Sequence, residues 1–229
     1  MCGRYTLTAT PEEIQQAFQL NSVPPLEPRY NIAPTQPVPI ITSEQRDVLT
    51  IVQWGLIPSW SKDASIASKL INARAETVDE KPSFRTSFKR RRCLIPADGF
   101  FEWKAGDKGE KKKPQFISVG DRELFAFAGL WDIWNSPHGD PVYTCTIITS
   151  EPNELIKSIH NRQAVILDKN QYSDWLADDT PLPALKDMLR PFAAERMKVY
   201  EISTLVNNAT VDTPAILEPV QPPEQRSLM

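Results

Sequence analysis

The sequence has few glycines, histidines and cysteines: eight, two and three in 229 residues. The cysteines lack CxxC spacing, so they match no common zinc or redox motif and suit a reducing compartment. No apolar run approaches the roughly 18 residues that a membrane span needs, and no basic segment followed by an apolar stretch marks a secretory signal. These absences predict a cytoplasmic protein with no metal centre and no membrane association.

Three common catalytic motifs are also missing: the P-loop, the GxGxxG dinucleotide pattern and the GxSxG nucleophile elbow. We therefore expect no cofactor. The formal net charge is −3, which argues against a protein that coats nucleic acid over its whole surface. Any nucleic-acid site must be local.

Short extended segments dominate the pattern and predict a β-rich α+β domain. They are residues 38–41, 48–54, 71–76, 93–103, 115–119, 123–131, 143–149, 164–167 and 198–202. Helices are expected at 11–20, where Thr10 and Glu13 form a capping box, at 80–88, at 152–159 and across 170–189, broken near Pro181 and Pro183. Residues 1–218 are expected to form one domain, and 219–229, rich in proline, a frayed tail.

Few side chains can transfer protons near neutral pH, because the only histidines are His138 and His160. His138 lies in "NSPHGDP" and is interpreted as an exposed turn residue. His160 closes the helix expected at 152–159, and a helix C-terminus favours the protonated imidazole that a general acid needs. A structural or exposed role for His160 stays open.

Strand alternation suggests two further polar candidates. In "INARAE", alternation places Asn72, Arg74 and Glu76 on one face, either a solvated strand face or a donor set for a sugar and phosphate. In "GFFEWK", it places Glu102 beside Phe100, and a carboxylate among apolar rings has a raised pKa that suits proton transfer. Pairing of Glu102 with an arginine is the alternative.

Basic residues occur in two runs, 89–92 and 111–113, which are interpreted as solvated faces. Single arginines standing beside other polar candidates are better placed to bind phosphates. They are Arg4, Arg29, Arg74, Arg85 and Arg162. Trp54 and Trp60 bracket a proline turn in "WGLIPSW", and a tryptophan on a turn can stack on a base.

Cys2 follows the initiator methionine directly, and its small side chain allows an aminopeptidase to remove Met1. Removal leaves an amine of pKa near 8 and a thiol of pKa near 8.5 on one residue. Such a 1,2-aminothiol captures an aldehyde, first as a Schiff base and then as a five-membered thiazolidine. The ring-opened sugar of an abasic DNA site is one aldehyde carried on a polyanion. Cys93 and Cys145 are interpreted as core residues.

Seven segments, taken in order, resemble the SRAP (SOS-response-associated peptidase-like) family, whose members shield abasic sites. They are "MCGRY", "RYNIAPT", "WGLIPSW", "INARAE", "PADGFFEW", "AGLWD" and "IHNR". The resemblance implies a barrel-like mixed sheet flanked by short helices and a positively charged groove for single-stranded DNA containing abasic sites. It also implies a monomer whose lyase-like and autopeptidase-like chemistry links it covalently to DNA. It does not name a replication partner.

The resemblance assigns roles to individual positions. Cys2 matches the nucleophile, Asn72 the asparagine that positions the opened sugar, and Glu102 the acid that assists proton transfer. His160 matches the histidine of Schiff-base chemistry and slow reversal. The DNA-binding positions are Arg4, Asn31, Trp60, Arg74, Arg85 and Arg162. Two positions depart from the family pattern: Gln163-Ala164 replaces the usual Met-Pro, and Ser61 stands where a second aromatic residue is common.

Three alternatives remain. An N-terminal-nucleophile glutamine amidotransferase also begins Met-Cys-Gly, although its downstream Arg-x-His-Gly and Asn-Gly signatures are absent. An autopeptidase would remove its own leader, but only Met1 precedes Cys2. A non-covalent single-strand binder would use the same arginines without chemistry.

Overall fold

Two β-sheets form the framework of the protein, whose computed structural model describes residues 2–106, 110–137 and 139–220. In the larger sheet, five strands close into a ring, because β10 pairs with both β4 and β9. In ring order they are β4 (Thr50–Trp54), β3 (Pro37–Thr42), β6 (Arg92–Ala97), β9 (Phe125–Asn135) and β10 (Pro141–Ser150). The edges carry β5 (Asn72–Arg74), β11 (Gln163–Ala164) and β12 (Ile166–Leu167). The expected barrel-like core is confirmed.

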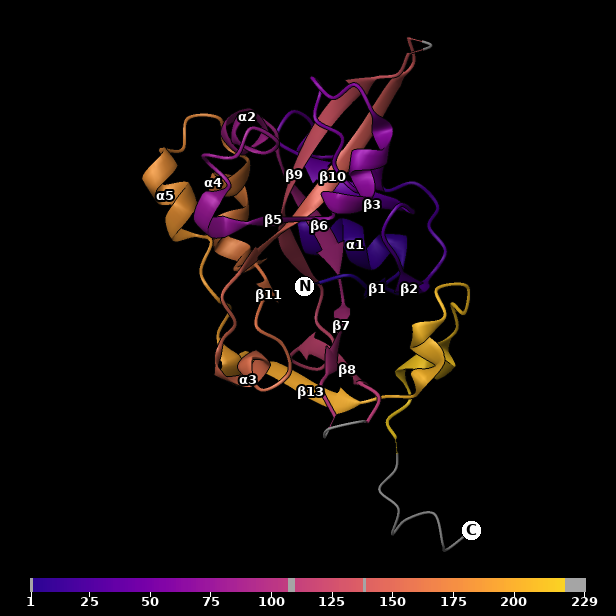
Figure 1. Ribbon diagram of the computed structural model, residues 1–229. Helices are drawn as coiled ribbons and strands as arrows, with labels where there is room; N and C mark the ends of the chain where they lie inside the picture. Colours follow the sequence, from indigo (N-terminus) through magenta and orange to yellow (C-terminus); the bar gives the residue numbers. More distant parts are fainter. Residues whose placement is uncertain (1, 107–109, 138, 221–229) are drawn as a thin grey trace, which may run out of the picture.

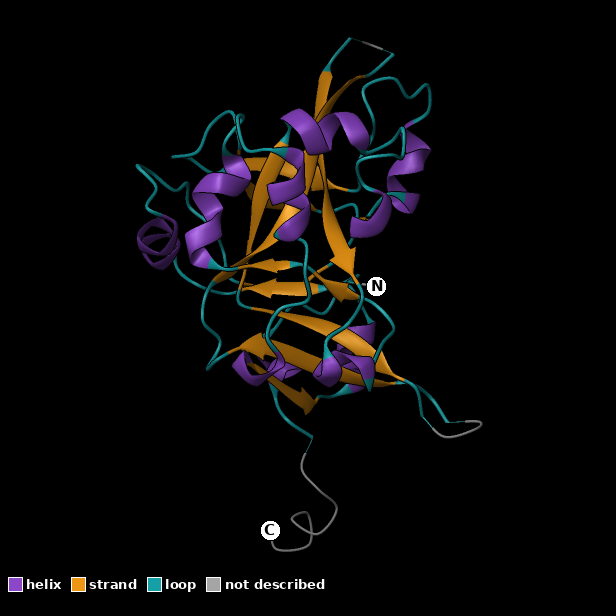
Figure 2. Cartoon of the chain, turned by 90° about the vertical axis from the view of Figure 1, so that its left-hand side faces the viewer, coloured by secondary structure: helices purple, strands orange, loops and turns teal. Residues whose placement is uncertain are grey.

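The second sheet is antiparallel and lies below the ring in Figures 1 and 2. Its order is β13 (Met197–Glu201), β8 (Lys113–Val119), β7 (Gly99–Lys104), β1 (Tyr5–Leu7) and β2 (Arg29–Ile32). Phe100 packs into the main core, whereas Phe101 and Trp103 join a smaller cluster with Phe116 and Val206. The alternation predicted for "GFFEWK" is therefore confirmed, and Glu102 shares the face of Phe100.

The two sheets join at Asp98, the single residue between Ala97, where β6 ends, and Gly99, where β7 begins. A Cβ atom at Gly99 would lie 2.2 Å from Cζ of Phe116, a buried ring that cannot move aside. Only glycine allows this approach. The single extended segment expected at 93–103 is thus two strands in different sheets.

Helix α1 (Pro11–Phe18) confirms its predicted start in detail: Thr10 is the N-cap, Pro11 the first helical residue, and Glu13 completes the capping box. The other helices are shorter than expected. They are α2 (Arg85–Arg90), α3 (Glu154–Lys157), α4 (Tyr172–Leu176) and α5 (Leu182–Asp187). Pro181 and Pro183 separate α4 from α5 as predicted, but Pro183 lies in the first turn of α5, where a missing N–H costs nothing.

The run at 89–92 is not simply a solvated face, because Arg92 is 0% exposed. Its guanidinium donates hydrogen bonds to the backbone oxygens of Phe88, Lys89, Trp175 and Ala177, at 2.6 to 2.9 Å. These acceptors replace water around a buried charge. Arg92 therefore ties β6 to α2 and α4.

The chain beyond β13 forms the short 3₁₀ helices η5 (Thr204–Asn207) and η6 (Pro214–Leu217), which cover the second sheet. Pro219 and Val220, assigned from sequence to the tail, pair with Ile202 and Glu201. The rest of the expected tail, 221–229, lies outside the described residues. No helix within the described ranges is long and apolar enough to cross a membrane.

Candidate active site

Four predicted catalytic residues come from both sheets and meet where the sheets join. Cys2 precedes β1, and Glu102 lies on β7; Asn72 begins β5, and His160 lies between α3 and β11. The β1–β7 register pairs Tyr5 with Phe100, and the N–H of Phe101 donates to the oxygen of Arg4 at 3.0 Å. Extending this register places the amino-terminal segment beside Glu102.

Cys2 is completely buried, and its backbone oxygen accepts a hydrogen bond of 2.8 Å from Nδ2 of Asn72. Asn72 is held in turn by the parallel pairing of β5 with β10, and by Trp54, whose Nε1 donates to the oxygen of Ile71 at 2.9 Å. Burial, together with the negative charge of Glu102, raises the pKa of the Cys2 thiol well above its ordinary value. The thiol is therefore protonated at neutral pH.

Glu102 is 2% exposed, and burial raises the pKa of its carboxyl group, while the positive charge of Lys112 acts in the opposite direction. A carboxyl group with a raised pKa can donate a proton nearer to neutral pH than an exposed glutamate can. The desolvated environment predicted for Glu102 is confirmed. Lys112 belongs to the run 111–113, which was interpreted as a solvated face, so its effect on the pKa of Glu102 was not predicted.

His160 follows the single turn of α3, and its N–H donates to the oxygen of Ile156 at 2.8 Å. The helix end was expected to favour the protonated imidazole. Instead, burial lowers the pKa of His160, and the positive charges of Lys112 and Arg162 act in the same direction. A four-residue helix has too few aligned peptides to outweigh these effects. His160 is therefore neutral at pH 7.

Several buried polar atoms at this site have no hydrogen-bond partner among the described residues. They are Nε of Arg4, Oδ1 of Asn72 and Nε of Arg162. Leaving such an atom unpaired costs about 1 to 3 kcal/mol, so most buried polar atoms in folded proteins are paired. Donors and an acceptor without protein partners are what a polar ligand requires.

Arg4 is half-buried and anchored at one nitrogen: Nη1 donates to Oδ1 of Asn31 at 2.6 Å and to the oxygen of Val206 at 2.7 Å. Asn31 is 0% exposed, and its Nδ2 donates to the oxygens of Asn208 and Val211. Direct contact of Asn31 with DNA, expected from the resemblance, is corrected to a supporting position behind Arg4.

Arg162 is also held within the protein. Its Nη1 and Nη2 donate to the two carboxylate oxygens of Glu76 at 2.6 and 2.9 Å, and Nη2 reaches the oxygen of Thr149 at 2.5 Å. Strand β5 ends at Arg74, and Glu76 lies in the 3₁₀ turn η2 (Ala75–Thr77). The burial alternation predicted for "INARAE" continues through this turn. Thr149 carried no sequence signal.

The remaining predicted DNA-binding side chains are on the surface. Trp60 is 59% exposed, and its Nε1 donates to the oxygen of Pro82 at 3.3 Å, whereas Trp54 is buried in the core. Arg74 and Arg85 are exposed at the end of β5 and the start of α2. Arg29 pairs with Asp212 at 2.6 Å. His138 lies outside the described residues.

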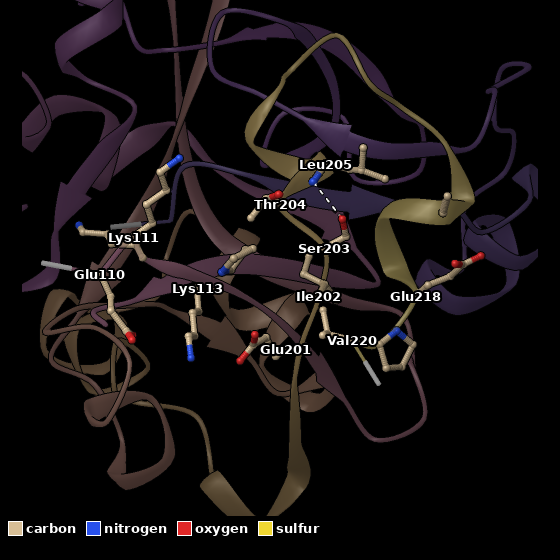
Figure 3. Close-up of a pocket in the computed structure, with 14 residues that line it drawn as sticks. Glu110, Lys111, Lys113, Glu201, Ile202, Ser203, Thr204, Leu205, Glu218 and Val220 are labelled. Carbon is tan, nitrogen blue, oxygen red and sulfur yellow. Dashed lines mark hydrogen bonds between the residues drawn. The ribbon is translucent and has the colours of Figure 1, made fainter. Parts of the chain in front are cut away.

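A hollow of about 790 Å³ lies between the residues at the start of β8 and the segment after β13, and none of the four predicted catalytic residues lines it (Figure 3). Lys112 lines the hollow, and its positive charge lowers the pKa of both Glu102 and His160. The charges around the hollow are mixed. Three lysines, at 111 to 113, are balanced by Glu110, Glu201 and Glu218. Among the described residues, no cluster of three or more His, Cys, Asp or Glu side chains could hold a metal ion.

Solved structures share this architecture. A crystal structure of a protein from Bacteroides thetaiotaomicron matches with a TM-score of 0.86 and 29% identity, covering 96% of this chain and 100% of that one. A crystal structure of a protein from Bordetella bronchiseptica matches with a TM-score of 0.76 and 26% identity, covering 88% of this chain and 100% of that one.

The chain is also similar in sequence to named proteins. Abasic site processing protein YoqW of Bacillus subtilis is 44% identical over 223 residues, 95% of this chain and 99% of that protein. Abasic site processing protein HMCES of Gallus gallus is 33% identical over 226 residues, 85% of this chain and 67% of that protein. The family described as SOS response associated peptidase (SRAP) matches residues 1–209, so the chain belongs to the SRAP family.

Proposed function

We propose that this chain processes abasic sites in single-stranded DNA by bonding covalently to the ring-opened sugar through Cys2. One observation carries the proposal: Cys2 is buried, with Nδ2 of Asn72 donating to its backbone oxygen and Glu102 close enough to shift the pKa of its thiol. The names of its relatives, abasic site processing proteins, support the substrate.

The chemistry begins when Met1 is removed, because the nitrogen of Cys2 is otherwise an amide and not nucleophilic. The free amine attacks the aldehyde carbon of the opened sugar, and loss of one water leaves a C=N bond. The sulfur then attacks the same carbon, which closes the thiazolidine. The thiol proton ends on the ring nitrogen, so the whole reaction forms one C–N and one C–S bond and releases one water.

Glu102 is suited to both proton transfers in this sequence. Its raised pKa lets the protonated carboxyl group donate to the departing hydroxyl, and the carboxylate that results can accept the proton of the Cys2 thiol. Neutral His160 can act on the Schiff base and in slow reversal. The covalent product shields the lesion for as long as the ring stays closed.

Phosphates on either side of the lesion require cationic side chains. Arg4, Arg74 and Arg85 supply them around the site, and Trp60 offers an exposed ring for a neighbouring base. These groups suit a single strand, whose bases are free to stack. We propose a monomer that acts in the cytoplasm on DNA and leaves undamaged strands unmodified.

The test is a denaturing gel of purified protein incubated with a single-stranded oligonucleotide that contains one abasic site. We expect a heat-resistant complex with this DNA and none with the intact oligonucleotide. Cys2→Ala should abolish the complex, and Cys2→Ser, which keeps the amine, should give strand cleavage through the imine without a stable complex. An undiminished complex in Cys2→Ala would contradict the proposal, and reversible binding alone would favour a non-covalent single-strand binder.

A further inference from the structure

Glu76 lies outside the residues assigned to catalysis, yet its carboxylate binds the guanidinium group of Arg162. The bidentate contact between them, at 2.6 and 2.9 Å, is the geometry in which a carboxylate fixes a guanidinium most tightly. The Arg162 side chain is only 16% exposed, and Thr149 accepts from it at 2.5 Å through its backbone oxygen. The hydrogen bond to Arg162 also lowers the pKa of Glu76, so this carboxylate stays charged at neutral pH.

Arg162 in turn holds His160 through its backbone. The N–H of Arg162 lies 3.0 Å from Nδ1 of His160. The backbone oxygen of Arg162 also lies near Nδ1, at 3.2 Å. The contact with the N–H is the shorter of the two, and an amide N–H only donates, so we take Nδ1 as the acceptor, with the single proton of the neutral ring on Nε2. The backbone of His160 is fixed from the other side by its bond to Ile156.

We propose that Glu76 is a positioning residue for His160: it clamps the Arg162 side chain, and the Arg162 backbone thereby holds the imidazole with its proton on Nε2. The clamp joins three segments that are distant in sequence, namely η2, the end of β10 and the loop before β11. The effect of Glu76 on the reaction rests on the role proposed above for His160. The effect of Glu76 on the position of the imidazole proton is independent of that role.

The direct test is an imidazole ¹H–¹⁵N NMR spectrum, which is simple because the chain has only two histidines. The signals of His160 are identified by their loss in His160→Ala. We expect the wild-type protein to show the Nε2–H form of His160, and Glu76→Gln, which keeps the size but loses the charge, to show a mixture of both forms. Glu80→Gln removes an exposed carboxylate nearby and should leave the spectrum unchanged.

The kinetic test combines the two substitutions. Glu76→Gln should slow formation of the DNA complex about tenfold, within the range of interaction energies between contacting residues. In a His160→Ala background the same change should have no further effect, because its target is gone. Glu80→Gln should match the wild type in both backgrounds.

Two results would overturn the inference: an unchanged Nε2–H signal in Glu76→Gln, or effects of the two substitutions that multiply in the double variant. If Glu76→Gln only tightened binding to intact single-stranded DNA, Glu76 would be a screen for the charge of Arg162 and not a positioning residue. Failure of the wild type to form any covalent complex would instead contradict the proposed function, while the NMR result would still decide the role of Glu76.

Discussion

Cys2 and Glu102 are both buried, and the Glu102 carboxylate disfavours the charged form of the Cys2 thiol. Burial and the Glu102 carboxylate hold the thiol protonated, and burial raises the pKa of the carboxyl group. A resting site with a neutral thiol protects the nucleophile from oxidants, because the thiolate is the reactive species. In the proposed reaction, proton transfer from sulfur to Glu102 then has to accompany ring closure.

The raised pKa of Glu102 also affects folding. Its folded-state pKa lies above the ordinary value of 4.5, so the native state binds this proton more tightly than the unfolded state does. The free energy of unfolding must therefore fall as pH rises from about 4.5 through the folded-state pKa. We predict that Glu102→Gln removes this loss, so the variant gains stability relative to the wild type as pH rises.

Urea denaturation between pH 5 and pH 8 measures this difference. Glu44→Gln, which changes an exposed glutamate, is the matched control and should follow the wild type at every pH. A difference between wild type and Glu102→Gln that stayed constant with pH would contradict the assignment of a raised pKa.

Single residues could be predicted from sequence where a local pattern determined their surroundings. The alternation of residues in β7 was enough to predict that Glu102 lies on the same face as Phe100 and is buried there. It could not show that Asn31 is buried, because its partners lie at 206, 208 and 211, far along the chain. The ion pair between Arg162 and Glu76 could not be predicted for the same reason, because the two residues are far apart in the sequence.

At the scale of elements, the long strands and helix α1 followed from the sequence, and the short strands β5, β11 and β12 fell in or beside segments expected to be extended, but β1 and β2 were not predicted. Helix α1 carries its own start signals, β9 is long and rich in aromatic residues, and β10 is long and rich in β-branched residues. Strands β1 and β2 have three and four residues, too few for a period to be recognised. They form because β1 pairs with both β2 and β7, which lie far from it in the sequence.

Arg92 gives a test of how the elements around the ring hold together. Arg92→Met leaves the backbone oxygens of Trp175 and Ala177 without their donor in a buried position. At about 1 to 3 kcal/mol for each unsatisfied group, we predict a loss of about 3 kcal/mol in the free energy of unfolding, measured in urea.

Arg90→Met is the control, because Arg90 is the exposed neighbour in the same run, and its effect should stay within about 0.5 kcal/mol. Equal effects of the two substitutions would mean that Arg92 contributes no more than a surface arginine. Both variants should still form the covalent complex with DNA at temperatures where they are folded.

Over the whole molecule, the proposed active site lies where the closed ring meets the second sheet, so neither sheet alone contains it. Sequence order could not show this, because Cys2 and Glu102 belong to one sheet and Asn72 and the His160 loop to the other. Because the net charge is −3, we expect binding to DNA to depend on a few arginines and not on a general positive field.

This local distribution predicts a shallow dependence on salt. Binding of the Cys2→Ala variant to abasic single-stranded DNA isolates the non-covalent step. With Arg4, Arg74 and Arg85 each meeting one phosphate, the slope of log K against log salt concentration should be about −2, from roughly −0.7 for each phosphate. A slope near zero would contradict phosphate binding, and a slope steeper than about −5 would require many more cations than the site supplies.

The most direct test of the account is the intact mass of the wild-type protein bound to an oligonucleotide with one abasic site. The account predicts a mass equal to the chain beginning at Cys2 plus the oligonucleotide minus one water, and no complex for chains that still carry Met1. A covalent complex of the same yield in which Met1 is retained would contradict it, because the Cys2 nitrogen would then be an amide.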